Sequence, residues 1–218
     1  MAKNPEFLFL GGRLSLDFVN TEIVVHGELR DLLSDFERWM AWQSAAGGPG
    51  RTEAMAMARE WGGNAESMNA LARAVAFRSE LRKMAGCVAS HKPVPKSAVG
   101  AINQLLRRGA AYGQLTPVGR GFVRQVHRDV REPADLLVPI AEDAADLLCE
   151  GDRGRVRKCS SPACVLLFYD KSRNRMRRWC SMDHCGNRAK VAAHYRRRRG
   201  RSPGNPVDQF HSRRQFHI

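Results

Sequence analysis

Residues 177–190 read RRWCSMDHCGNRAK, which places two cysteines, Cys180 and Cys185, in an arginine-rich part of the chain. A second pair, Cys159 and Cys164, lies upstream with the same separation, and 15 residues lie between the two pairs. Two short loops that each present two thiolates can surround one tetrahedral zinc ion. The spacing therefore predicts a single structural Zn²⁺ with these four cysteines as its ligands.

Other uses of the four cysteines must be weighed against zinc. A disulfide is disfavoured because the chain opens without a signal peptide, so a reducing cytosol is the expected compartment. An iron–sulfur cluster usually has different spacing, and redox-active thiols stay an alternative because nearby arginines lower a thiol pKa. Zinc is favoured because the segment has few large apolar residues, and metal binding can supply the missing folding energy. His184 is a candidate substitute ligand, although a surface position is the expected one.

The excess positive charge of the chain is confined to its C-terminal third. Residues 1–150 contain 18 basic and 18 acidic residues, whereas residues 151–218 contain 18 basic and four acidic residues and so carry the whole net charge of +14. Such segregation favours nucleic-acid binding over a merely solvated surface. Residues 187–199 have few helix breakers and are expected to form a basic helix positioned by the metal. The candidate nucleic-acid-binding residues are Arg173, Arg175, Arg177, Arg178, Asn187, Arg188, Lys190, Arg196, Arg197, Arg198 and Arg199.

The neutral N-terminal part shows mainly helical periodicity. Apolar spacing predicts helices after a Ser34–Glu37 capping box, over 65–88 with Arg73, Arg78 and Arg82 on the outside, up to Gly109, and from Pro133 onward. Residues 112–126 read as a β-hairpin, and the apolar runs around Gly11-Gly12 suit a hairpin or a strand–turn–helix. The expected class is mainly α with a short β-hairpin (α+β), followed by a small treble-type zinc module with a basic helix. The expected domains are 1–150, 151–199 and a disordered basic tail, 200–218.

The N-terminal part carries no recognisable catalytic motif, and no apolar stretch is long enough to span a membrane. Asp17, Asn20, Thr21 and Glu22 form a polar cluster that a ligand or metal could use, but capping or turn formation is the favoured interpretation. Cys87 and Cys149 lie on apolar helical stretches, where a lone cysteine is usually a small buried residue. A sensing or dimerising role suits such a domain better than an enzyme does.

Several motifs in the chain resemble a known two-domain architecture. The C-terminal motifs (Cys159…Cys164, Phe168-Tyr169-Asp170, Arg178-Trp179-Cys180 and Cys185-Gly186-Asn187-Arg188) resemble the CGNR zinc finger of bacterial proteins regarded as stress-induced transcriptional regulators. The stretch GGRLSLDFVNT, residues 11–21, looks like the opening of the ABATE domain that accompanies this finger. The resemblance covers about residues 5–199. It implies zinc-ligand roles for the four cysteines and a turn made by Gly186, Asn187 and Arg188.

Together these features predict a cytoplasmic DNA-binding transcriptional regulator, with no membrane partner and no enzymatic activity. DNA is the expected partner of residues 151–199. Residues 1–150 are expected to sense an unidentified small-molecule effector or to form a homodimer. The alternative is an RNA-binding accessory protein, because zinc ribbons and basic helices serve RNA equally well.

Overall fold

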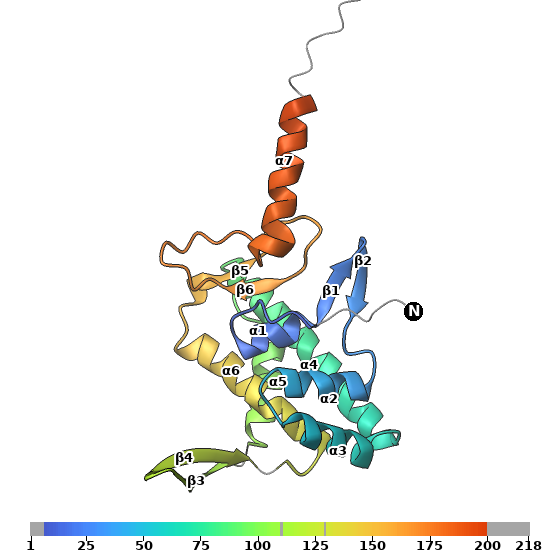
Figure 1. The fold of residues 1–218 in the computed structure, drawn as a ribbon, viewed down its shortest axis with the longest axis vertical. Coiled ribbons are helices and arrows are strands. Elements are labelled where there is room, and N and C mark those ends of the chain that lie inside the picture. The colour runs from blue at the N-terminus through green and yellow to red at the C-terminus, as the bar shows by residue number, and fades with distance from the viewer. Residues whose placement is uncertain (1–6, 110, 129, 200–218) are drawn as a thin grey trace, which may run out of the picture.

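The computed structural model describes residues 7–109, 111–128 and 130–199 (Figure 1). In this part of the chain, residues up to 150 form a mainly helical domain with two antiparallel hairpins. The elements of the domain are α1 (Leu14–Val19), β1 (Glu22–Val25), β2 (Glu28–Asp31), α2 (Phe36–Ala45), α3 (Arg51–Trp61), α4 (Ala65–Ala89), α5 (Lys96–Leu106), β3 (Ala111–Val118), β4 (Gly121–Arg128), the 3₁₀ helix η1 (Pro133–Leu137) and α6 (Val138–Cys149). The described helices include none that is long and apolar enough to cross a membrane.

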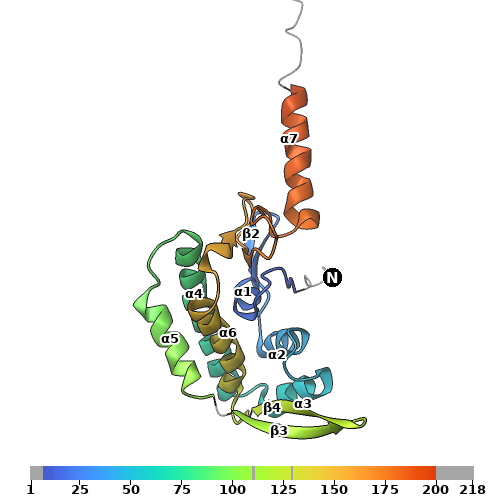
Figure 2. The ribbon, with the colours of Figure 1, turned by 90° about the vertical axis from the view of Figure 1, so that its left-hand side faces the viewer.

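The short helix α1 lies at the centre of this domain. Helices α4, α5 and α6 run side by side, and α1 packs against both α4 and α6 (Figure 2). Leu16, Phe18 and Val19 of α1 are fully buried, and the Phe18 ring lies 5.1 Å from that of Trp42 in α2. Six residues cannot hold a helix in water by themselves, so this packing is what makes α1 helical.

The segment before α1 was expected to form either a hairpin or a strand–turn–helix around Gly11-Gly12. Residues 7–10 form no strand, so a hairpin around Gly11-Gly12 is wrong, whereas the helix after the turn is confirmed. Gly12 has a φ of +72°, a left-handed conformation that glycine adopts without strain. The hairpin in this region lies further on, where β1 pairs with β2 from Glu22↔Asp31 to Val25↔Glu28.

Most of the expected helices are confirmed, with one change at a helix start. Helix α4 covers the expected 65–88, α5 ends before Gly109, and Pro133 opens η1 ahead of α6. The β3–β4 hairpin is also confirmed. The cap of α2 is Asp35 instead of Ser34: the Asp35 carboxylate accepts the Arg38 N–H at 2.7 Å, and the Ser34 hydroxyl donates to that carboxylate.

Arg78 of α4 is buried, which contradicts its expected place on the outer face of the helix. Its side chain is 1% exposed and donates to both carboxylate oxygens of Asp31, at 2.7 and 2.5 Å. It also donates to the Thr21 hydroxyl at 2.8 Å and lies 3.5 Å from a Glu22 oxygen. The guanidinium thereby lowers the pKa of Asp31 even though burial acts in the opposite direction. Arg78 thus fastens the β1–β2 hairpin to the helical core.

Removing this guanidinium should destabilise the protein strongly. We expect Arg78→Ala to lower the free energy of unfolding by about 3–5 kcal/mol, because Asp31 would keep its charge beside the core without its ion-pair partner. Arg73→Ala is the matched control on the same helix, since the Arg73 side chain is 64% exposed and should contribute less than about 1 kcal/mol. Urea unfolding of the three proteins measures the difference, and equal losses in both variants would contradict it.

Candidate zinc site and its attachment to the helical domain

Four buried cysteines converge at the C-terminal end of the structure. The 3₁₀ turn η2 (Arg153–Arg155) leads into a short hairpin of β5 (Val156–Lys158) and β6 (Leu167–Tyr169), and the loop between its strands carries Cys159 and Cys164. Cys180 lies just before the π-helical turn η3 (Met182–Gly186) and Cys185 lies within it, and η3 continues as α7 (Asn187–Arg199). One ligand atom from each of the four cysteines lies within 4.8 Å of the others.

The geometry and chemistry of this cluster fit one zinc ion. Tetrahedral Zn²⁺ with sulfur at about 2.3 Å requires sulfur–sulfur separations of about 3.8 Å. The Sγ atoms of Cys164 and Cys180 are 3.9 Å apart, and those of Cys180 and Cys185 are 3.5 Å apart. All four side chains are buried, and the Cys180 N–H is directed at Cys159 Sγ at 3.4 Å. The site therefore has the four soft donors, the spacing and the backbone support of a structural zinc site.

Hydrogen bonds between the thiols move their pKa values in opposite directions. The Cys180 thiol, acting as a donor, lowers the pKa of Cys164 to about 5. The same interaction raises the pKa of Cys180, and burial raises that of Cys159. Zinc binding must therefore displace protons from the thiols that hold them, and zinc affinity falls as the pH falls.

The Gly-Asn-Arg tripeptide shapes the path from the cysteines into α7. A Cβ atom at Gly186 would lie 2.6 Å from Met182 Sδ and 3.3 Å from the Trp179 ring, so a larger residue cannot fit without a shift. The Arg188 guanidinium donates to the His184 carbonyl at 2.6 Å and to Cys185 Sγ at 3.3 Å. Arg188 therefore supports a zinc-site sulfur, as residues behind metal ligands commonly do, whereas the Asn187 side chain is exposed.

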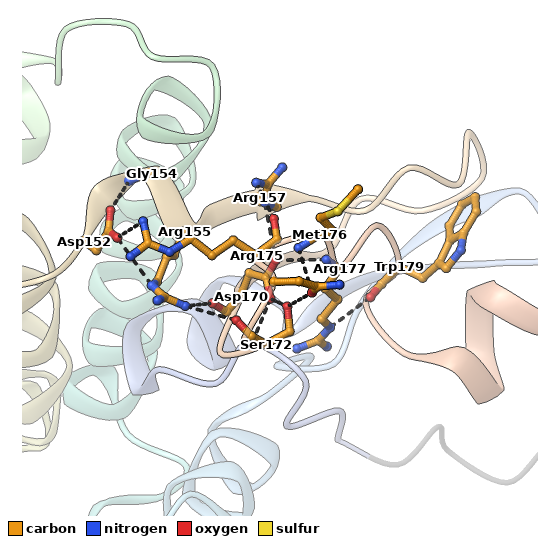
Figure 3. A network of polar contacts seen from close by, with 11 residues as sticks. Asp152, Gly154, Arg155, Arg157, Asp170, Ser172, Arg175, Met176, Arg177 and Trp179 are labelled. Atoms are coloured by element: carbon orange, nitrogen blue, oxygen red, sulfur yellow. Dashed lines mark hydrogen bonds and ion pairs between the residues drawn. The ribbon is translucent and has the colours of Figure 1, made fainter.

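A buried aspartate organises the arginine-rich loop before Cys180 (Figure 3). Asp170 is fully buried, and its carboxylate accepts hydrogen bonds from the Ser172 N–H and hydroxyl and from the Arg177 N–H, at 2.5–2.9 Å. Burial alone would raise the pKa of Asp170, but these hydrogen bonds outweigh it and hold the pKa below its usual range. Arg157 adds an ion pair at 3.6 Å. Residues 170–177 are thus folded around one carboxylate.

The expected nucleic-acid-binding arginines have different environments. The Arg177 guanidinium donates to the carbonyls of Trp179, Cys180 and Leu10 and lies 4.3 Å from the centre of the Phe168 ring, so its contacts are internal. Arg175 pairs with Asp152 at 3.0 Å and remains largely exposed. Exposed members of the set also include Arg173, Arg178, Asn187 and Lys190. The side chains of Arg196–Arg199 and the expected tail, 200–218, lie outside the described residues.

The zinc segment is fastened to the helical domain by its backbone. The buried Asn20 side chain donates to the Leu167 carbonyl at 2.8 Å and accepts the Leu167 N–H at 3.0 Å, as a neighbouring strand would. Arg82 of α4 donates to the carbonyls of Val19 and Val165 and pairs with Glu22 at 2.7 Å. Ile23 and Leu32 belong to the same buried cluster as the four cysteines.

The N-terminal polar cluster is thus explained by contacts within the protein. Asn20 and Glu22 act as above, while the Thr21 hydroxyl donates to the Phe18 carbonyl at 2.7 Å. Asp17 accepts the Gly11 N–H at 2.7 Å. Burial raises the pKa of Asp17 to about 6, the Gly11 hydrogen bond acts against this rise, and neighbouring Asp143 adds to it. These residues join segments instead of lining a pocket.

The sequence also predicted burial for two cysteines, Cys87 and Cys149, and a surface position for His184. Cys149 is exposed, so its expected burial is wrong; it lies at the last position of α6, where the apolar side of the helix ends. Cys87 is half-buried. His184 is exposed, and its ring Nδ1 lies 2.9 Å from the Ser181 hydroxyl, so it stays outside the sulfur cluster and lies at the surface as expected.

A helical domain joined to a four-cysteine finger defines a two-part zinc protein, and comparison with known families agrees with this class. Residues 12–151 match the ABATE family, described as "Putative stress-induced transcription regulator", and residues 155–198 match the CGNR zinc finger. The chain belongs to the ABATE family and carries a CGNR zinc finger. A search of curated proteins gives no significant match.

Zinc content tests the metal site directly. We expect about one zinc per chain in the parent and its loss in Cys180→Ser, because three thiolates and a hydroxyl no longer form a tetrahedral soft-donor site. Cys149→Ser is the matched control, since this exposed cysteine lies outside the cluster. Elemental analysis of the dialysed proteins measures the metal. A parent protein without zinc, or equal zinc in both variants, would contradict the assignment.

The Asn20 tether should affect both stability and metal affinity. Asn20→Ala leaves the buried Leu167 N–H and C=O unpaired, and we expect it to lower the free energy of unfolding by about 2–4 kcal/mol. Zinc affinity should fall with it, because the cysteine-bearing hairpin loses its support. Chelator competition measures the affinity, and Asn103→Ala, at an exposed position of α5, is the control. Unchanged zinc affinity in Asn20→Ala would show that the finger forms without the tether.

The raised pKa of Asp17 predicts a specific pH dependence. The fold favours the protonated carboxyl, so this contribution to stability is present below about pH 4 and is lost as the pH rises through about 6. Asp17→Asn cannot titrate there. Its stability relative to the parent should therefore increase between pH 4 and pH 7, by up to about 3 kcal/mol. Urea unfolding of both proteins across this range measures the difference in their free energies of unfolding. Acid removes zinc from both proteins, so that loss cancels from the difference. A difference that does not change with pH would contradict the raised pKa of Asp17.

Proposed function

We propose that the protein is a cytoplasmic DNA-binding transcription regulator whose zinc finger holds α7 against the DNA. The observation that carries this proposal is the placement of α7: it starts at the sulfur cluster and projects away from the rest of the molecule (Figure 1). Zinc would fix the direction of α7, and the exposed surface of α7 would then be available to a polyanion.

The surface around the start of α7 has the charge that DNA binding requires. Lys190 is exposed on the helix, and Arg173 and Arg178 are exposed on the loop before Cys180. Acidic residues are rare here, with only four among residues 151–218. We assign phosphate contacts to these exposed side chains, together with Arg175 and Arg196–Arg199. We assign base contacts to no residue. Arg177 and Arg188 are instead assigned to positioning the loop and the zinc-site sulfur.

Residues 1–150 would supply the regulatory half of the protein. The domain shares a buried cluster with the zinc segment through Ile23 and Leu32. A conformational change in one part would therefore alter the packing of the other. We propose that it brings two chains together and responds to a signal. The choice of DNA over RNA rests on the family, described as transcription regulators, and on a single projecting helix suited to a major groove.

Salt-dependent DNA binding tests this proposal. If the finger neutralises about five phosphates, log affinity should fall with log salt at a slope near −4 to −5. Lys190→Ala should weaken binding to all duplexes and make the slope shallower by about one. Lys92→Ala, at an exposed position of the helical domain, is the matched control and should change neither. Fluorescence anisotropy with duplex DNA measures both quantities; tighter binding to structured RNA, or an unchanged Lys190→Ala slope, would overturn the assignment.

A further inference from the structure

The β3–β4 hairpin extends from the helical domain at the end opposite α7 (Figures 1 and 2). Its two eight-residue strands pair along their full length, from Ala111↔Arg128 to Val118↔Gly121. Within β3 only Thr116 is partly shielded from solvent. A two-stranded hairpin is marginally stable in water by itself, so a hairpin as exposed as this one is expected to be completed by a partner.

The hairpin belongs to a basic segment that the balanced charge of residues 1–150 conceals. Residues 81–128 contain nine basic residues and no acidic one, and three of the nine are the arginines of the hairpin. Arg120 and Arg124 are exposed, and in the described part of the chain neither of them pairs with an acidic residue. These unpaired cations favour a polyanionic partner and oppose self-association.

The charge on the paired strands is not spread evenly over the two faces. The register places Arg124 opposite Leu115, on the same face as Gly113 and Phe122. A Cβ atom at Gly113 would lie 2.7 Å from Arg124 Nε, so this glycine leaves the room that the guanidinium occupies across the neighbouring strand. One face therefore presents a guanidinium and an aromatic ring together, a combination that is typical of nucleic-acid-binding surfaces.

Apolar side chains surround the distal half of the hairpin on both faces. Leu115 and Phe122 are 68% and 73% exposed on one face, and Val118 and Val123 are 57% and 46% exposed on the other. A flat partner surface would cover only one of these faces. Covering both at once requires a groove whose two walls enclose the hairpin.

We infer that the distal half of the β3–β4 hairpin inserts into the minor groove of a DNA duplex other than the one held by α7. Proteins that bind the minor groove combine arginines with apolar side chains that wedge between base steps. The sugars along the two walls of the groove would cover both apolar faces of the hairpin. Because the hairpin and α7 lie at opposite ends of the molecule, one chain would hold two separate duplex segments (Figure 1).

The position of Arg120 favours DNA over an anionic membrane. Gly119 and Arg120 form the turn of the hairpin, so Arg120 lies at its tip. Insertion of the apolar side chains into a bilayer would carry this guanidinium toward the hydrocarbon, which is costly. A groove bordered by phosphates attracts the same guanidinium. The description of the family as a transcription regulator favours DNA over an acidic protein surface.

The number of duplexes bound by each chain tests the inference. The zinc-loaded full chain is sedimented with an excess of a short labelled duplex rich in A·T and containing TA steps, which unstack easily. We expect two duplexes per chain for the parent and one for the double variant Arg120→Ala/Arg124→Ala at the same concentrations. Each lost phosphate contact costs roughly eightfold in affinity at about 0.1 M salt, so the second duplex should bind at least tenfold more weakly.

Two single variants separate the contributions of charge, apolar contact and fold. Phe122→Ala should weaken binding of the second duplex about fivefold and leave its salt slope unchanged, because no charge is lost. The double arginine variant should make that slope shallower by nearly two. Gln114→Ala is the matched control, since this exposed residue lies on the face opposite Arg124 and should change neither quantity.

The possible outcomes also separate the hairpin from the finger, since the inference presumes the DNA binding proposed above. One duplex per parent chain that only Lys190→Ala weakens, or two duplexes retained by the double arginine variant, overturns the inference alone. One duplex that only the arginine variant weakens supports the hairpin and overturns the assignment of α7. Arginine-dependent sedimentation with phosphatidylserine-containing vesicles, without a second duplex, overturns the inference in favour of a lipid surface.

Discussion

The buried Asn20 amide joins the two halves of this protein through both backbone groups of one strand residue. Asn20 follows α1 directly, and α1 is the helix at the centre of the N-terminal core. By pairing with both backbone groups of Leu167, Asn20 takes the place of a strand beside β6 and fixes the hairpin whose loop carries Cys159 and Cys164. Zinc then ties that loop to Cys180 and Cys185, where α7 begins. The direction of α7 thus depends on a chain of contacts that starts in the helical core.

This arrangement makes the finger unlike a zinc module attached by a linker. Besides the Asn20 contacts, Arg82 of α4 reaches the Val165 carbonyl, and Arg177 reaches back to the Leu10 carbonyl. Ile23 from β1 packs with the cysteines themselves. Metal binding and packing on the helical domain therefore stabilise the same small core, and neither half contains all of the apolar surface that the finger uses.

The sequence allowed the zinc site and the longer helices to be predicted, because both depend on local spacing. Four cysteines at symmetric intervals and an apolar stripe over 65–88 need no knowledge of distant residues. The tethers could not be found this way. Arg78 lies on the apolar side of α4, between buried Ala74 and Leu81, and the burial of a charged side chain there is explained only by distant partners such as Asp31, 47 residues away. The β1–β2 turn was missed because His26 and Gly27 occupy its two positive-φ positions, where the recognisable turn sequences are Asn-Gly and Asp-Gly.

Charge counting is similarly informative about the segment but not about individual side chains. Eighteen basic residues after position 150 point to a polyanion, yet Arg177 stacks on Phe168 and donates to three carbonyls, and Arg188 contacts Cys185 Sγ. Both arginines are used where a compact fold with few apolar residues needs planar, multidentate donors, a role that lysine fills poorly. The arginines near the metal thus have two functions in one short segment: some build the support for α7, and the exposed ones form the surface that this support presents.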